Sequence, residues 1–146
     1  MDEASSKQAA LAVWRAFSTR DVEQIKAVLT EDAEWLAPAG NATAVALGGS
    51  SHMVGAAAIA NFIARDFGRL FVRDVSIAVA GVFAEGNIVV FEQRLRATLV
   101  NGRDYDNLYC FVLEMAGGRA RRIREYMDTA RGFQMMFGEE APSQLV

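Results

Sequence analysis

The sequence contains few of the residues that build metal centres and covalent crosslinks. Its 146 residues include one cysteine, Cys110, and one histidine, His52. One cysteine cannot form a disulfide within the chain, and one cysteine with one histidine cannot assemble a structural zinc site. Only 2 prolines and 12 glycines are present, which excludes collagen-like and low-complexity chains. We therefore expect a folded protein with no bound metal.

The chain also lacks an excess of positive charge and any long apolar run. It has 15 Lys and Arg residues against 18 Asp and Glu residues, a formal net charge of -3. Such a chain has no broad basic surface for a phosphate backbone, so we expect no nucleic acid partner. No apolar run is long enough to span a membrane, and residues 1–6 are acidic and polar. The sequence predicts a cytoplasmic protein with no membrane contact.

The remaining composition is that of an ordinary globular protein. Hydrophobic residues make up 52% of the chain and charged residues 23%. The chain is short for two independent cores and no linker interrupts it, so we expect one domain over residues 1–146. With nucleic acid and membranes excluded, a small organic molecule is the expected partner.

The first half of the sequence has the periodicity of helices. Apolar residues spaced three and four apart predict three of them. These helices cover residues 5–19, 22–29 and 55–70. Residues 33–37 lie between an acidic pair and a proline-containing turn, which favours a short strand. Residues 40–51 are small and rich in turn formers, and we expect them to form a flexible loop that covers the site as a lid.

After Phe71 the apolar period changes to two, which is typical of β-strands. Glycine-containing turns separate four expected strands. The strands cover residues 75–83, 88–99, 105–115 and 120–128. Helices followed by an antiparallel meander predict an α+β fold, in which three N-terminal helices pack on the concave face of a curved antiparallel sheet.

Alternation along each strand separates an inner, apolar face from an outer one. On the strand over 88–99, Gln93 is the polar member of the apolar face. On the next strand, Tyr105, Asn107 and Tyr109 share a face with apolar residues. On the last strand, one of the two phases places Glu125 on the inner face. The alternation therefore predicts an apolar hollow with a few polar groups.

Glu125 is the leading candidate for proton transfer. An ionised carboxylate in apolar surroundings is disfavoured, which raises its pKa toward neutral pH. The alternative is an ion pair with a neighbouring arginine, such as Arg121 or Arg124, because most glutamates are exposed or paired. Asp128 is the second candidate acid, and Tyr109 is the candidate hydrogen-bond donor to a ligand oxygen.

A second group of residues is expected to line the ligand site. Each has a structural alternative: buried polar groups often satisfy one another, aromatic residues often only pack, and a single loop histidine is commonly a surface residue. The candidates for ligand binding are Gln93, Tyr105, Asn107, Trp14, Trp35, Phe62 and His52.

The outer face of the expected sheet is also too apolar to face water alone. Its small and apolar residues are Ala78, Ala80, Val82, Leu108, Cys110 and Val112. The long helices are assigned to the concave side, so none of them is left to cover the outer face. The simplest way to bury that face is to pair it with the same face of a second copy of the chain. We expect a homodimer through the outer sheet face.

Several motifs in this order resemble the nuclear transport factor 2-like superfamily, in particular its SnoaL-like polyketide cyclase and ketosteroid isomerase branches. The motifs are residues 21–25 leading to 32–35 and Pro38, residues 55–59, and residues 118–120 with 124–129. The resemblance covers nearly the whole chain. It implies a conical α+β barrel around an apolar pocket, commonly dimeric, and often an enzyme that uses no metal or organic cofactor.

The resemblance carries over only part of the known catalytic sets. Ala37 stands where ketosteroid isomerases have their general base, and Tyr109 falls near one of their oxyanion donors. Gln93 and Leu95 stand where limonene epoxide hydrolases have an arginine and an aspartate on the second long strand. Glu125 matches the last-strand aspartate of those hydrolases, and the SnoaL-like cyclases would need an acid there.

Two hypotheses follow. In the first, the protein is an isomerase, cyclase or lyase that acts on an apolar carbonyl compound; Glu125 moves a proton, while Tyr109 and Asn107 polarise the carbonyl oxygen. In the second, the pocket binds an apolar metabolite without catalysis, or the domain only mediates dimerisation. An elevated pKa of Glu125 that shifts with ligand would separate the first from the second.

Overall fold

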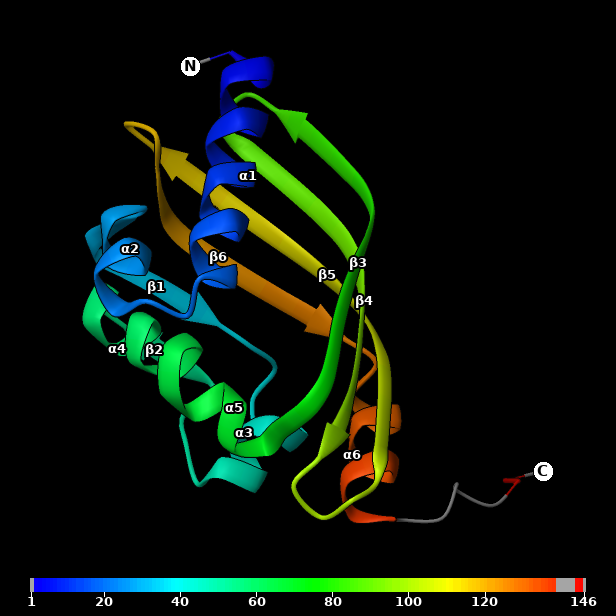
Figure 1. Cartoon of the computed structure of the whole chain (residues 1–146). Coiled ribbons are helices and arrows are strands. Elements are labelled where there is room, and N and C mark those ends of the chain that lie inside the picture. Colours follow the sequence, from blue (N-terminus) through cyan, green and yellow to red (C-terminus); the bar gives the residue numbers. More distant parts are fainter. Residues whose placement is uncertain (1, 139–143, 146) are drawn as a thin grey trace.

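The computed structural model describes residues 2–138 and 144–145, and it has helices on one side of a curved six-stranded sheet (Figure 1). The helical elements are α1 (Glu3–Ser18), α2 (Val22–Ala27), α3 (Ala42–Leu47), α4 (Ala56–Asn61), the π-helix η1 (Phe62–Asp66), α5 (Phe67–Leu70) and α6 (Thr129–Phe137). The strands are β1 (Leu29–Leu36), β2 (His52–Val54), β3 (Phe71–Glu85), β4 (Ile88–Leu99), β5 (Asp104–Ala116) and β6 (Arg119–Met127).

The expected helices form, with three differences. The helix expected over 22–29 is α2 and ends at Ala27, because Leu29 begins β1. The helix expected over 55–70 is α4, η1 and α5 in succession, because a turn with the wider π spacing interrupts it at Phe62. The loop expected over 40–51 instead contains α3, whose first turn is capped by the Asn41 side chain accepting from the Ala44 N–H. Short polar residues favour such N-caps, so a stretch rich in turn formers also starts a helix.

The sheet has the order β2-β1-β6-β5-β4-β3. The four long strands pair antiparallel as expected, whereas β1 and β6 run parallel. The sheet is therefore mixed rather than purely antiparallel. It is also curved but unclosed, so the conical barrel implied by the resemblance is open between its edge strands β2 and β3. Among the described residues, no helix is long and apolar enough to cross a membrane.

The alternation of the strands correctly identifies the inner face. On β4, Val89, Phe91 and Gln93 are buried, and on β5 the same holds for Tyr109 and Leu113. Helix α1 lies across this concave face and buries its own apolar stripe there (Figure 1). Burial of these side chains provides the main driving force for folding.

A bulge in β3 changes the face on which its last residues lie. Val79 pairs with Gln93 but Gly81 pairs with Glu92, so Ala80 is an extra residue in the ladder. Val82 consequently packs against the core, although the sequence places it on the outer face. Phe83 takes an outer position and covers Gly81, where a β-carbon would lie 2.7 Å from its ring.

Candidate active site

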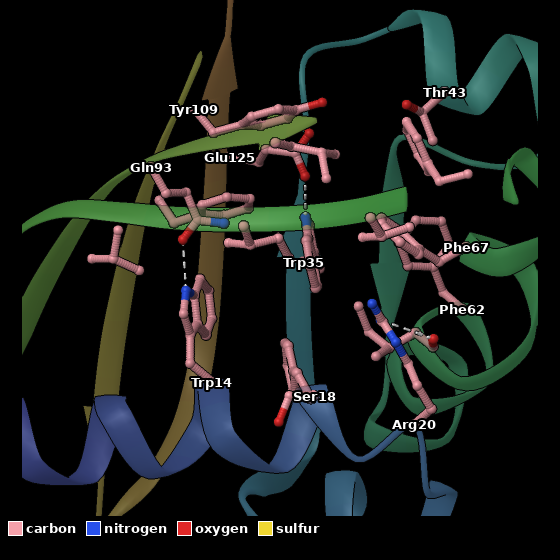
Figure 2. Close-up of a pocket in the computed structure, with 18 residues that line it drawn as sticks. Trp14, Ser18, Arg20, Trp35, Thr43, Phe62, Phe67, Gln93, Tyr109 and Glu125 are labelled. Atoms are coloured by element: carbon pink, nitrogen blue, oxygen red, sulfur yellow. Dashed lines mark hydrogen bonds between the residues drawn. The ribbon is translucent and has the colours of Figure 1, made fainter. Parts of the chain in front are cut away.

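A cavity of about 420 Å³ lies between α1, the concave face of the sheet and the α4–α5 segment (Figure 2). This volume is in the range of small-molecule sites. Most of its lining is aromatic or aliphatic, with a few polar groups. The lining residues are Trp14, Phe17, Ser18, Arg20, Trp35, Thr43, Phe62, Ile63, Phe67, Phe71, Val75, Ile77, Val79, Gln93, Leu95, Tyr109, Phe111 and Glu125.

Glu125 projects from β6 into this cavity, beside Phe111 of β5. Burial raises the pKa of Glu125 to about 7, and the hydrogen bond from Trp35 opposes that rise because it favours the ionised form. The Trp35 Nε1–H donates to Glu125 Oε1 at 3.0 Å (Figure 2). No described residue bonds to the other oxygen, Oε2, which is not fully buried. One carboxyl oxygen is therefore held while the other faces the cavity.

The expected alternative for Glu125, an ion pair with an arginine, does not occur among the described residues. Arg121 pairs with Glu114 across the β5–β6 ladder instead. Arg122 binds both Glu34 and Glu114. Glu125 is thus a carboxyl group without a cation beside it, which leaves burial as the dominant influence on its pKa.

Gln93 presents hydrogen-bond donors to the same cavity. The Trp14 Nε1–H can only donate, and it lies 2.6 Å from Gln93 Oε1, so the amide oxygen accepts that bond (Figure 2). The amide nitrogen Nε2 has no partner among the described residues and is not fully buried. Trp14 therefore orients the amide so that its two N–H groups are available to a ligand.

Tyr109 is a second donor, and its neighbours determine its direction. Asn107 Nδ2 donates to the Asp128 carbonyl and to the Tyr105 hydroxyl. The hydroxyls of Tyr105 and Tyr109 lie 2.5 Å apart. Either oxygen can be the donor by distance; Tyr105 is buried and among the described residues has the Tyr109 oxygen as its one acceptor, so the arrangement that satisfies both hydroxyls has Tyr105 donating to Tyr109. The proton of Tyr109 is then free to point into the cavity that this residue lines.

The same contacts correct the expected role of Asn107. Its side chain lines neither cavity, and its polar atoms bond to Tyr105, to the Asp128 carbonyl and to the Leu108 N–H. Asn107 therefore holds Tyr105 in place rather than a ligand oxygen. Tyr105 likewise lines neither of these two cavities, and its hydroxyl contacts that of Tyr109.

Two other candidates lie outside the cavity. Asp128 follows the end of β6 and caps α6, with its carboxylate accepting from the Arg131 N–H at 3.0 Å. It is therefore not a second acid in the site.

His52 also lies outside the cavity. It belongs to strand β2 rather than to a loop, and its Nε2 contacts Glu34 Oε1 at 3.2 Å where both side chains are partly exposed. The remaining candidates Trp14, Trp35, Phe62 and Gln93 line the cavity.

A second, more polar cavity adjoins the first. It lies beneath α3 and the segment before β2, and Trp35, Thr43, Phe62 and Glu125 line both. Thr43 and Arg20 of the first cavity were not anticipated from the sequence. Both stand outside the strands, in α3 and between α1 and α2, where side-chain alternation carries no information about direction.

The described residues offer little to hold a metal ion. They contain no group of three or more His, Cys, Asp or Glu side chains placed to ligate one. The first cavity itself offers a carboxyl group whose pKa is raised to about 7, together with N–H and O–H donors.

A curved sheet with helices on its concave face and a cavity between them is the arrangement of the nuclear transport factor 2-like fold. Residues 10–123 match the SnoaL-like domain model, and the chain belongs to this family. No curated protein sequence matches the chain.

Solved structures share the fold over nearly the full length. A nuclear transport factor 2-like protein of unknown function from Burkholderia pseudomallei is 23% identical, with a TM-score of 0.78 over 94% of this chain and 99% of its own. TerC, crystallised with polyporic acid, is 25% identical, with a TM-score of 0.74 over 90% and 97%. An LEH-like epoxide hydrolase from M. tuberculosis is 20% identical, with a TM-score of 0.71 over 94% of this chain and 93% of its own.

Proposed function

We propose that the protein is an enzyme that moves a proton on an apolar carbonyl compound, in a reaction of isomerase, cyclase or lyase type. The observation that carries this proposal is the position of Glu125 in an apolar cavity, where burial brings its pKa to about 7. A group with this pKa has substantial acid and base populations at neutral pH, which is the requirement for general acid and base catalysis.

The steps follow from the directions of the polar groups. The Glu125 carboxylate removes a proton from the carbon next to the carbonyl, and Oε2 is the oxygen free to do so. The carbonyl oxygen gains negative charge as an enolate forms, and Tyr109 and Gln93 Nε2 donate hydrogen bonds to it. The neutral Glu125 then returns the proton to the same or another carbon, which regenerates the carboxylate. Trp35 keeps Glu125 oriented throughout.

The partner in this proposal is a small, mainly apolar molecule. The aromatic lining supports it, because stacked and edge-on rings around the cavity provide a large apolar surface with few polar groups. The co-crystallisation of TerC with polyporic acid is consistent with a small organic ligand in this fold.

A second candidate function is binding without catalysis. It is favoured by Ala37, which stands where the resemblance to ketosteroid isomerases would put a general base, and by Leu95, which replaces an epoxide hydrolase aspartate. In that case Glu125 would be a neutral hydrogen-bonding group for an apolar metabolite.

Deuterium exchange tests the two functions without knowledge of the natural substrate. The probe is 2-tetralone in D₂O, and NMR follows the loss of its protons next to the carbonyl. The wild type should exceed the protein-free rate, and Glu125→Gln and Tyr109→Phe should each reduce the catalysed exchange about a hundredfold. Glu31→Gln, an exposed residue of β1 that lines neither cavity, is the matched control and should have no effect. Unchanged exchange in both site variants rejects the enzyme, and binding of the ketone without exchange supports the second function.

We also propose that two copies pair through the outer face of the sheet. Leu108, Phe83 and Tyr126 are 65%, 55% and 52% exposed there, an unusual set for a surface in water. A dimer mass in sedimentation at micromolar concentration, and a monomer mass for Leu108→Arg, are the expected results. A monomeric wild type would reject the dimer.

A further inference from the structure

The cavity is charged at two places only. Among the described residues that line it, Glu125 is the one carboxyl group and Arg20 is the one cation. The two project from different elements, Glu125 from β6 and Arg20 from the link between α1 and α2 (Figure 2). Neither Arg20 nor Glu125 takes part in an ion pair with any described residue, so the two groups do not pair with each other across the cavity.

Two contacts hold the Arg20 guanidinium over the cavity. One N–H donates to the Ile63 carbonyl at 3.3 Å, from Nη1. The carbon of the guanidinium lies 4.5 Å from the centre of the Phe67 ring, a cation–π contact. Ile63 lies in the π-helix η1 and Phe67 begins α5 directly after it, and both line the cavity. The orientation of Arg20 is thus set before a ligand arrives.

The guanidinium has capacity left for a ligand. It carries five N–H donors, of which a described residue accepts one. No described carboxylate pairs with it, in contrast to Arg94, Arg121 and Arg122 on the outer face of the sheet. Arg20 is an exposed residue, but the partial burial of its side chain lowers the guanidinium pKa, and no described carboxylate pairs with it to offset that effect. The guanidinium is planar and has N–H groups that no described residue uses. It can therefore bind a carboxylate through two parallel hydrogen bonds.

We infer that the ligand is an apolar organic acid, whose carboxylate binds Arg20 while its apolar body fills the aromatic cavity. This places the anionic end of the ligand at the α1–α2 corner. The remainder extends toward Gln93, Tyr109 and Glu125, where the carbonyl group of the proposed reaction lies. The reactive end rests on the proposed function, whereas the carboxylate subsite depends on Arg20 and is tested by binding alone.

The test compares 2-naphthoate with its neutral counterpart 2-naphthamide by titration calorimetry at pH 6, where Glu125 is mainly protonated. The wild type should bind the naphthoate at least about tenfold more tightly, as expected for hydrogen bonds to a charged group. Arg20→Gln should remove this preference while still binding the amide. Arg15→Gln, an exposed arginine of α1 that does not line the cavity, is the matched control and should retain it.

Three results would overturn the inference: equal affinity of the wild type for both probes, no binding of the naphthoate, or a preference that survives in Arg20→Gln. Circular dichroism of each variant checks that the fold is intact. The two proposals fail separately, because a lost anion preference leaves deuterium exchange by Glu125 untouched, and absent exchange leaves the preference for the naphthoate in place.

Discussion

Replacing Glu125 by glutamine should make the protein more stable at pH 8 than the wild type. Glutamine keeps the shape of the protonated acid, and its oxygen can still accept from the Trp35 N–H. It has no charge to bury. The wild type must ionise Glu125 in the cavity at high pH, and burial opposes that ionisation, as the pKa of about 7 indicates.

The size of the effect follows from the pKa of Glu125 in the two states. It lies near its ordinary value of 4.5 in the unfolded chain and is raised to about 7 in the folded protein. Below pH 4.5 both states are protonated and the free energy of unfolding carries no penalty. Between the two values only the unfolded chain ionises, so stability falls as pH rises. Since one pKa unit is worth about 1.4 kcal/mol, the total loss is about 3 kcal/mol, complete just above pH 7.

Urea unfolding followed by tryptophan fluorescence, repeated from pH 4.5 to 8.5, measures this difference. The two proteins should have similar free energies of unfolding near pH 4.5 and should diverge by about 3 kcal/mol at pH 8, with Glu125→Gln the more stable. Glu31→Gln, at an exposed position of β1 that lines neither cavity, provides the comparison and should follow the wild type. A constant difference across the pH range, or a less stable Glu125→Gln at pH 8, would refute the reasoning.

Three other variants test the contacts around the site. Trp35→Phe removes the donor that favours ionised Glu125, so an NMR titration should find the pKa of Glu125 raised further; an unchanged or lower value would contradict this. Asp128→Ala removes the cap of α6 and should lower the free energy of unfolding by about 1 kcal/mol, while deuterium exchange continues at the wild-type rate. Asn107→Leu should cost roughly 1–3 kcal/mol in urea unfolding, because the buried Tyr105 hydroxyl and Asp128 carbonyl lose their donor; a neutral effect would argue against that network.

Strand alternation carries most of what the sequence could predict about the site. Successive side chains of a strand point to opposite faces, so the apolar residues at every second position of β4 and β5 identify the inner face. Gln93 and Tyr109 are in phase with those residues and are buried, as expected. The same rule allows two phases for β6, and the structure selects the one with Glu125 inside. The antiparallel order of β3 to β6 was predictable because short turns join consecutive strands.

The errors have two causes, an element boundary in the first case and contacts between different elements in the others. Asp128 has the right chemistry for an acid, but β6 ends at Met127 and the next residue becomes a helix cap. Asn107 points inward as expected, yet its neighbours use its donors. Arg20 was missed because its direction depends on Ile63 and Phe67, more than forty residues further along the chain. The spacing of residues around Arg20 gives no information about contacts with so distant a segment.

The most direct test of the account is the titration of the Glu125 side-chain carboxyl by NMR, with ¹³C-labelled glutamate and Glu125→Gln to assign the signal. The account predicts a midpoint of about 7 in the free protein, and a shift of that midpoint when 2-tetralone fills the cavity. A midpoint near the ordinary value of 4.5, unaffected by the ketone, would contradict a buried proton-transfer group.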